Sequence, residues 1–419
     1  MTNATDPSQS RFSSSEWTLL ALMAAIQFSH IVDFMIMMPL GPQLMRLFNL
    51  GPKEFGWLVS SYTLSAGLSG FAASFFIDRF DRKTSLLFFY FGFSAGTLAC
   101  ALAPTFELLF LARSLTGLFG GVLGSLVLSI VSDAIPYQRR GSAMGIVMGS
   151  FSIASVVGVP FSLYLANLFS WHAPFIFLGI VSFFVMALIA KSMKPMHGHL
   201  RSRDSHHPPL AALTHIAKTP NQLIALAFLF CLVMGQFSVI PFLSASYVAN
   251  AGMTESQLPL IYLFGGLCTI VASPTVGRLS DRYGKHRVFL ISVLISMIPI
   301  YGITNLNSQP LWLILALSSS FFVMMSGRMV PAMALVSATA TPAYRGSFMS
   351  ISSSVQQISA ALASFISGLI VLRTAEGHLL RYEYVGYLAI VFSVFAFALA
   401  LRVRAEDPTA LQSSQPELR

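Results

Sequence analysis

The segment SFFIDRFDRK at residues 74–83 decides the fold, because a segment of the same design, GRLSDRYGKHR, recurs at residues 277–287. Each segment joins two long apolar runs, and the acids Asp78 and Asp281 lie 203 residues apart. A shared motif at a fixed offset indicates an internal duplication. The sequence therefore predicts two structurally similar halves that superpose with Asp78 over Asp281.

The composition indicates a membrane protein. Of the 419 residues, 55% are hydrophobic and only 10% are charged, whereas a soluble domain carries about 25% charged residues. These values exclude an ordinary cytosolic enzyme, a disordered protein and a fibrous one. The apolar residues form runs of about 20, long enough to cross a ~30 Å hydrocarbon core as helices, and they lack the alternation of β-barrel strands. Twelve such runs are present, at residues 17–40, 55–77, 85–104, 107–131, 143–166, 173–192, 221–243, 256–277, 288–305, 310–334, 347–372 and 384–403. The predicted fold is an all-α polytopic membrane protein of twelve transmembrane helices, in two six-helix bundles related by pseudo-two-fold symmetry.

The distribution of basic residues predicts the topology. If the N-terminus is inside, the inside segments hold 19 of the 25 Lys and Arg residues. Because positive residues gather in cytoplasmic loops, we expect both termini in the cytoplasm and the chain in the bacterial inner membrane. The net charge of +9 thus belongs to the loops, and it forms no basic stripe of the kind that binds nucleic acid.

A long polar connection divides the chain. The expected parts are a cytoplasmic tail at 1–16, an N-terminal bundle at 17–192, a cytoplasmic linker at 193–220, a C-terminal bundle at 221–403 and a cytoplasmic tail at 404–419. The linker contains His197, His199, His206, His207 and His215. No helix or cysteine frame fixes these histidines, so a solvated linker is favoured over a metal site. Residues 209–218 have apolar side chains at helical spacing and could form a helix on the membrane surface.

The repeated loop resembles the signature G-x-x-x-D-R-x-G-R-K of the major facilitator superfamily, which places this motif in both halves of a twelve-span layout. The resemblance implies a membrane transporter. It also implies a gating latch, in which charged groups hold two helices together in one state and release them in another. The predicted latch residues are Asp78, Arg79, Arg82, Lys83, Asp133, Asp281 and Arg282.

The first copy of the loop departs from the signature, because Ser74 and Asp81 replace glycines. Asp81 either adds an ion-pair partner or strains the turn. Asp133, at the end of the fourth span, is similar to a family acid that contacts this loop. The alternative interpretation is that the basic residues only anchor the topology and that Asp133 is a plain surface acid.

Arg113 is an ionisable residue inside the fourth span. The segment RSLTGLFGG at 113–121 resembles the family's R-x-x-x-G-x-x-G-G segment, whose small residues, including Gly117, allow helices to approach closely. A charge near the membrane centre costs ~2.5–3.5 kcal/mol on insertion scales and needs a partner or water. Asp33 lies ~10 Å and Arg113 ~9 Å from the outer ends of their spans. Because the resemblance also implies that spans one and four adjoin, we predict that these two side chains pair.

Asp33, Arg113 and His30 are the predicted proton-coupling residues. His30 precedes Asp33 by about one helical turn, on a neighbouring face. Ionisable groups at one level can pass a proton, because a change in one charge alters the protonation of the others. The alternative is a structural ion pair. Gln236 follows Asp33 by the same 203 residues, so the duplication predicts that it superposes on Asp33. Gln236 cannot titrate, so charge chemistry is expected only in the N-terminal half.

The fifth span contains the sequence GVP, with Gly158 and Pro160. It resembles the glycine–proline motif of antiporters in this superfamily, and its local form is most similar to the drug:proton antiporter and sugar-efflux group. The departures are Ser162, Ser170 and His172, where the family usually has two glycines and an arginine. A simple helix kink is the alternative reading.

Polar residues elsewhere in the spans predict a substrate cavity between the halves. The candidates are Gln27, Gln236, Arg328 and Gln356. Their alternative role is hydrogen bonding between helices.

Together these features predict a secondary active transporter that exports small hydrophobic or amphipathic solutes, drug-like compounds or sugars, in exchange for protons. A proton-coupled importer or facilitator on the same fold is the alternative. An embedded enzyme is disfavoured because the sequence offers no paired acid, histidine or metal constellation, and a receptor would leave the duplication without a purpose. The expected partners are a small-molecule substrate, protons and membrane lipid, with no nucleic acid, metal or cofactor, and the chain is expected to act as a monomer.

Overall fold

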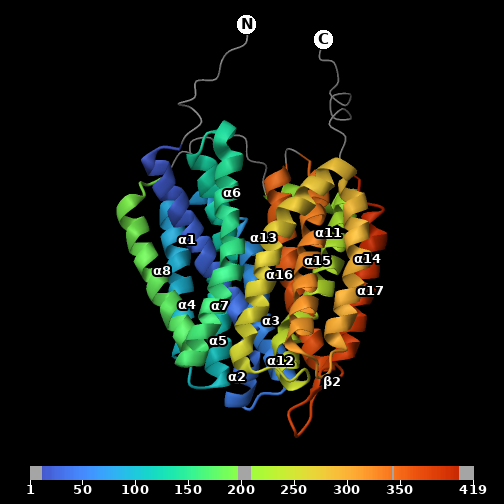
Figure 1. The fold of residues 1–419 in the computed structure, drawn as a ribbon. Coiled ribbons are helices and arrows are strands. Elements are labelled where there is room, and N and C mark those ends of the chain that lie inside the picture. Colours follow the sequence, from blue (N-terminus) through green and yellow to red (C-terminus); the bar gives the residue numbers. More distant parts are fainter. Residues whose placement is uncertain (1–11, 197–208, 342–343, 405–419) are drawn as a thin grey trace, which may run out of the picture.

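The computed structural model describes residues 12–196, 209–341 and 344–404 and arranges long helices side by side (Figure 1). The N-terminal half contains α1 (Ser14–Ile36), α2 (Gly41–Leu47), α3 (Pro52–Ala73), η2 (Ile77–Arg79), α4 (Arg82–Ala101), α5 (Phe106–Ala134), α6 (Tyr137–Ile153), η3 (Ala154–Gly158), α7 (Val159–Leu168) and α8 (His172–Ser192). The C-terminal half contains α10 (Pro209–Lys218), α11 (Pro220–Phe237), α12 (Ile240–Ala249), η5 (Glu255–Gln257), α13 (Leu258–Tyr283), α14 (Lys285–Thr304), α15 (Leu311–Ala338), α16 (Arg345–Ile370), β1 (Leu372–Arg373), β2 (Leu379–Leu380) and α17 (Tyr382–Ala400). Most of both predicted tails and the linker histidines His197, His199, His206 and His207 lie outside the described residues.

The predicted number of spans is found in the described chain. Eleven helical segments are long and apolar enough to cross a membrane. The twelfth span is α3, which has 22 residues but is less apolar because it is rich in serine and glycine. It packs between α5 and α16, and a side chain at Gly56 would come within 2.9 Å of Gly368 on α16. A helix enclosed by other helices needs small residues more than it needs apolar ones.

Two spans contain a break and the first span is followed by one; a kink at the glycine–proline motif was the alternative reading of the sequence, and the other two breaks were not predicted. The chain turns between α1 and α2, forms a π-helical turn at η3 between α6 and α7, and bends between α11 and α12. In each case the next helix has proline as its second residue, namely Pro42, Pro160 and Pro241. Proline has no N–H to continue the preceding helix but fits the first turn of a new one.

The two halves are built alike. In the N-terminal half α3 and α4 pack on α5, α4 packs on α8, and α1 packs on α6; in the C-terminal half α13 and α14 pack on α15, α14 packs on α17, and α11 packs on α16. The contacts between the halves are equivalent too, because α3 packs on α16 while α13 packs on η3 and α7. This repetition is the pseudo-two-fold arrangement that the duplication predicts.

The two ends of the bundle differ. We call the end where α1 begins and α17 ends the termini end, and the opposite end the far end (Figure 1). At the far end one hydrophobic core contains residues of both halves, such as Phe55 and Phe242, whose ring centroids are 5.7 Å apart. Toward the termini end, each half has its own separate core. The halves thus share one core at the far end and have separate cores toward the termini end.

Candidate functional site

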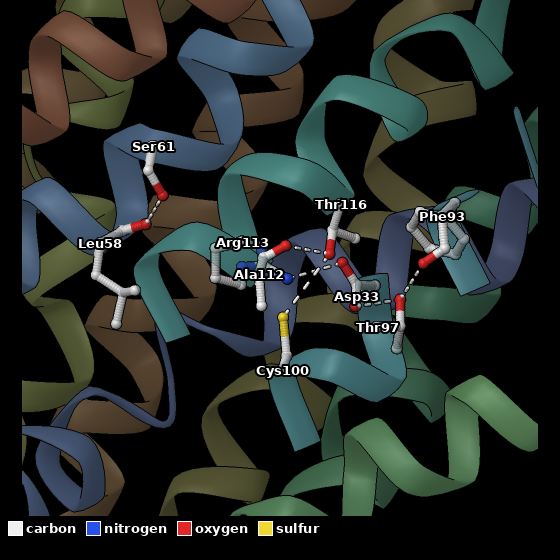
Figure 2. Close-up of polar contacts among 9 residues, drawn as sticks. All are labelled: Asp33, Leu58, Ser61, Phe93, Thr97, Cys100, Ala112, Arg113 and Thr116. Carbon is white, nitrogen blue, oxygen red and sulfur yellow. Dashed lines mark hydrogen bonds and ion pairs between the residues drawn. The ribbon is translucent and has the colours of Figure 1, made fainter. Parts of the chain in front are cut away.

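A buried ion pair lies inside the N-terminal half (Figure 2). Asp33 of α1 is 0% exposed and Arg113 of α5 is 1% exposed, and Arg113 Nη1 lies 2.8 Å from Asp33 Oδ2. This is the contact that the depths of the two residues predict. Thr97 of α4 adds a hydrogen bond, since its hydroxyl donates to Asp33 Oδ1 at 3.1 Å. Thr97 was not among the predicted residues, although its depth in the third span, about seven residues from the outer end, matches that of Asp33.

An aromatic ring covers the other side of the arginine. The guanidinium carbon of Arg113 lies 4.4 Å from the ring centroid of Tyr62 on α3, a cation–π contact. The glycine motif of the fourth span makes this approach possible, because a side chain at Gly117 would overlap the backbone carbonyl of Tyr62. Cys100 also lies beside the pair, with its sulfur 3.7 Å from Thr116 Oγ1 (Figure 2). Side chains of four helices, α1, α3, α4 and α5, therefore surround this one ion pair.

His30 lies near the pair but makes no hydrogen bond to it. Both ring nitrogens are buried without a partner among the described residues, and the ring centroid is 6.5 Å from that of Tyr62 and 5.9 Å from that of Phe93. The Tyr62 hydroxyl is buried without a partner as well. A side chain at Gly120 would lie 2.8 Å from this hydroxyl and 3.4 Å from His30 Nε2, so the two groups face the same spot.

The predicted cavity residues are placed in different surroundings. Gln27 lies one turn before His30, and its Oε1 is buried without a partner. Gln236 is 1% exposed and its amide donates to the carbonyl of Met325 at 3.4 Å. Gln356 donates to a carbonyl of its own helix, that of Ser352, at 3.4 Å.

Arg328, also predicted for the cavity, points into the C-terminal half instead. It is 1% exposed, and its Nη1 donates to Ser296 of α14 at 3.3 Å and to Ser393 of α17 at 3.0 Å. No acid lies within 4.0 Å of it in the described parts of the chain. The sequence suggested the cavity because Arg328 is ionisable, but the facing serines of α14 and α17 make a place for it inside the bundle.

The two copies of the repeated loop differ. In the first copy Arg82 Nε lies 3.0 Å from Asp133 Oδ2, which is the contact implied for this acid. Asp81 caps α4 by accepting the Thr84 N–H at 2.9 Å, and it also accepts the N–H of Met196 at 2.6 Å. All of these contacts stay within the N-terminal half.

The remaining latch residues lie in different surroundings, as far as the structure describes them. Lys83 Nζ donates to the carbonyl of Ala190 at 2.8 Å, and Arg79 is exposed. The side chain of Asp78 lies outside the described residues. In the second copy, Asp281 and Arg282 are exposed, and the guanidinium of Arg282 lies over its neighbour, the Tyr283 ring, at 5.3 Å.

The glycine–proline motif lies where three helices meet. Gly158 ends the π-helical turn η3, and a side chain there would overlap Val32 and lie 3.1 Å from Phe28, both on α1. On the other side of the turn, a side chain at Gly266 of α13 would be 2.7 Å from Val156. The motif therefore contacts both the helix of Asp33 and the opposite half.

A charged contact joins the halves at the far end, and no sequence motif indicated it. Arg46, at the end of α2, makes a two-pronged ion pair with Glu255 of η5, at 2.5 and 3.2 Å. Asn167 donates to the Glu255 carbonyl at 3.3 Å and accepts from Gln43 at 3.0 Å. The Glu255 carboxylate raises the pKa of the Arg46 guanidinium, mainly through their hydrogen bond, so Arg46 stays protonated. We call the ion pair of Arg46 and Glu255 the far-end clamp.

The described residues offer no cluster of three or more His, Cys, Asp or Glu side chains that could hold a metal ion. His215, the described linker histidine, stacks on Tyr344 with ring centroids 4.6 Å apart and lies 3.1 Å from Thr341 Oγ1. Its helix α10 packs on α11 and α16, so it belongs to the C-terminal half.

Comparison with known proteins identifies the family to which this chain belongs. The family model of the Major Facilitator Superfamily matches residues 23–247 and 226–418. An uncharacterized MFS-type transporter of Bacillus subtilis, YceJ, is 26% identical over 84% of this chain and 88% of its own. A probable sugar efflux transporter of Mannheimia succiniciproducens is 20% identical over 62% of this chain and 64% of its own.

Two solved structures share the fold. A bacterial homologue of the human lysosomal transporter Spinster, in an inward-facing conformation, superposes with a TM-score of 0.73 at 12% identity, over 95% of this chain and 100% of the other. The nucleoside transporter NupG superposes with a TM-score of 0.74 at 14% identity, over 93% of this chain and 100% of the other.

Proposed function

Because this chain belongs to the major facilitator superfamily, a family of membrane transporters and not of enzymes, we propose that it exports small hydrophobic or amphipathic solutes, drug-like compounds or sugars, in exchange for protons. The names of two relatives, probable sugar efflux transporters of Mannheimia succiniciproducens and Helicobacter pylori, support the direction. We further propose a monomer in the bacterial inner membrane, surrounded by lipid and with both termini in the cytoplasm.

The observation that carries this proposal is the buried pair of Asp33 and Arg113. Burial opposes the charged form of the acid, whereas the arginine 2.8 Å away favours it. These opposing effects are strong in a low dielectric, so a small change in surroundings can decide whether Asp33 holds a proton. Protonation would weaken its bond to Arg113 and leave the guanidinium free for other contacts.

The pair is connected to both contacts between the halves. Next to Asp33 on α1, Val32 touches the Gly158 turn, and that segment packs on α13 of the C-terminal half. Arg113 touches Tyr62 on α3, and α3 packs on α16. A change in charge at the pair can thus alter the two surfaces where the halves contact each other, between the Gly158 segment and α13 and between α3 and α16. This coupling supplies the two-state element that alternating access needs.

The joined far end and the separate cores at the termini end support a substrate path that opens toward the termini. If the termini are cytoplasmic, this is an inward-open state that takes up solute from the cytoplasm. Exchange for incoming protons would then drive export, since the membrane potential contributes ~2.3 kcal/mol per charge per 100 mV, plus the pH difference.

The test is transport into inside-out vesicles with an imposed pH gradient and a panel of solutes, from about pH 5.5 to about pH 8.5, where histidines and perturbed acids titrate. The wild type should concentrate its substrate in a pH-dependent way. Asp33→Asn should abolish this uphill transport while leaving downhill exchange partly intact. Glu107→Gln is the matched control, because Glu107 is an exposed acid at the start of α5 and should behave as wild type.

Other outcomes would redirect the assignment. Full, pH-dependent uphill transport by Asp33→Asn would contradict the role of Asp33 and leave His30 as the next candidate. Accumulation only when protons and solute move in the same direction would identify a proton-coupled importer. Transport that ignores the pH gradient in the wild type would identify a facilitator.

A further inference from the structure

Arg328 is a buried cation without a counter-charge among the described residues. Its side chain is 1% exposed, and the hydroxyls that it contacts on α14 and α17 are neutral. No ion pair within 4.0 Å includes it in the part of the chain that the structure describes. Arginine does not lose its proton in proteins, and an isolated buried charge is strongly unfavourable. A group of opposite charge is therefore needed to balance Arg328.

The two serines that touch Arg328 cannot supply this balance. Each hydroxyl donates its hydrogen to a carbonyl of its own helix, at 2.6 Å from Ser296 and at 2.7 Å from Ser393. Both serines therefore meet the guanidinium only as neutral acceptors, and both accept from the same nitrogen, Nη1. Arg328 Nε is buried and has no hydrogen-bond partner in the described chain. The guanidinium thus keeps a donor and a positive charge that these contacts do not satisfy.

A third serine lies beside Arg328, and its hydroxyl is not engaged. Ser292 lies one turn before Ser296 on α14, so the two share one side of that helix. Its Oγ would be 3.2 Å from a side chain at Gly327, the residue before Arg328, and it makes no hydrogen bond within the described residues. Along the arginine side chain, Nε comes between the α15 backbone beside Ser292 and the Nη1 beside Ser296. The unused hydroxyl and the unused Nε therefore belong to the same stretch of the contact between α14 and α15.

The unused groups select a small monovalent anion. The other charged residues of the described α11–α17 region lie near helix ends or in loops, so a single positive charge is available here. A divalent anion would leave a buried negative charge unbalanced. The close packing of helices favours an atomic ion over a larger carboxylate. We propose that Arg328 and Ser292 bind a halide, chloride under physiological conditions, with Arg328 Nε and Ser292 Oγ as its donors. This site lies within the C-terminal half and does not depend on the proposed function.

The experiment measures chloride binding to the purified full chain in detergent. Chlorine NMR detects a bound ion because the protein broadens the chloride line, and added bromide should reverse the broadening by competition. The unfolding temperature should also rise when chloride replaces gluconate at constant sodium, since a ligand that binds the folded state stabilises it. Arg328→Met should lose both effects. Ser292→Ala keeps the charge but removes one donor, so it should weaken chloride binding about tenfold.

Arg402→Met is the matched control, because it removes an exposed arginine just after α17 in the same half. It should keep the wild-type line broadening and the chloride-dependent rise in unfolding temperature. The proposal is overturned if the wild type shows neither effect, if a folded Arg328→Met protein still shows both, or if Ser292→Ala keeps the wild-type affinity. Equal loss in Arg402→Met would also overturn it, since the anion would then be attracted by the net positive charge. None of these measurements involves transport, so their outcome is independent of the test of Asp33→Asn.

Discussion

The two halves of the molecule each bury an arginine on the fourth helix, but they compensate its charge in different ways. Arg113 of α5 has a carboxylate at 2.8 Å and an aromatic ring over its face. Arg328 of α15 has two serine hydroxyls. The repeat offset would place the equivalent of Arg113 at Ala316, not at Arg328. The duplicated fold therefore carries two unrelated arginine sites, and only the N-terminal one contains an acid that can change its charge.

The largest expected effect is that of Arg113→Met, which leaves Asp33 buried without its ion-pair partner. Breaking a buried pair on one side costs about 3–5 kcal/mol, so the variant should unfold at a clearly lower temperature in detergent and lose uphill transport. Thermal unfolding and vesicle transport measure the two effects. Wild-type stability with retained pH-dependent transport would show that the pair is not the switching element.

Arg328→Met tests the other side of the comparison. No buried charge is stranded, because Ser296 and Ser393 also bond to carbonyls of their own helices, those of Val293 at 2.6 Å and Ala389 at 2.7 Å. Because a buried charge without a counter-ion is unfavourable, an apolar side chain of similar size should not lower the stability. The variant should therefore keep both its fold and its pH-dependent transport. Loss of the pH dependence in a folded Arg328→Met protein would break the comparison, since charge chemistry would then extend to both halves.

The far-end clamp should have a smaller effect, because its ion pair is partly exposed to solvent. Glu255→Gln removes a partly exposed ion pair worth about 0.2–1 kcal/mol, enough to shift the equilibrium between closed and open far ends by up to about fivefold. Distances between spin labels placed on the two halves at this end report the populations. The double variant Arg46→Glu/Glu255→Arg, which reverses the ion pair, should restore the wild-type populations. An unchanged distance distribution in Glu255→Gln would show that the clamp is not a gate.

The smallest effects are expected at the repeated loops, where the first copy is bonded and the second is exposed. Arg82→Ala removes the contact with Asp133 and should slow turnover about twofold with less change in apparent affinity, by a barrier change of about 0.4 kcal/mol. Asp281→Asn should slow it less. Equal, wild-type turnover in both variants would leave the loops as topology anchors only.

Much of the fold could be predicted because its signals are local or repeated. Apolar run length, loop charges and the recurring loop indicated twelve spans in two similar halves. α3 was found in spite of its modest apolarity, since its apolar run is long enough and lies between turn signals. The breaks before Pro42 and Pro241 were not predicted, and a kink at Pro160 was only the alternative reading, because proline also occurs inside continuous helices such as α13 and α14.

The candidate site was predictable where only depth mattered. Asp33 and Arg113 lie at one level of adjoining helices, so counting residues along each helix was enough to pair them. Tyr62 and Arg328 could not be placed in this way, because the direction in which a side chain points depends on how each helix is rotated against its neighbours. The far-end clamp was also out of reach, since it joins residues of two short helices that lie 209 positions apart in the sequence.

By itself the sequence determined the membrane class, the duplication, the family resemblance and the ion pair in the first half. These follow from composition, period and depth, which are properties of single helices. Only the tertiary structure decided that Arg328 turns into its own bundle, that Tyr62 covers Arg113, and that the halves share a core at one end and have separate cores at the other. Those features depend on the rotation and tilt of packed helices, which arise from many weak contacts between distant residues.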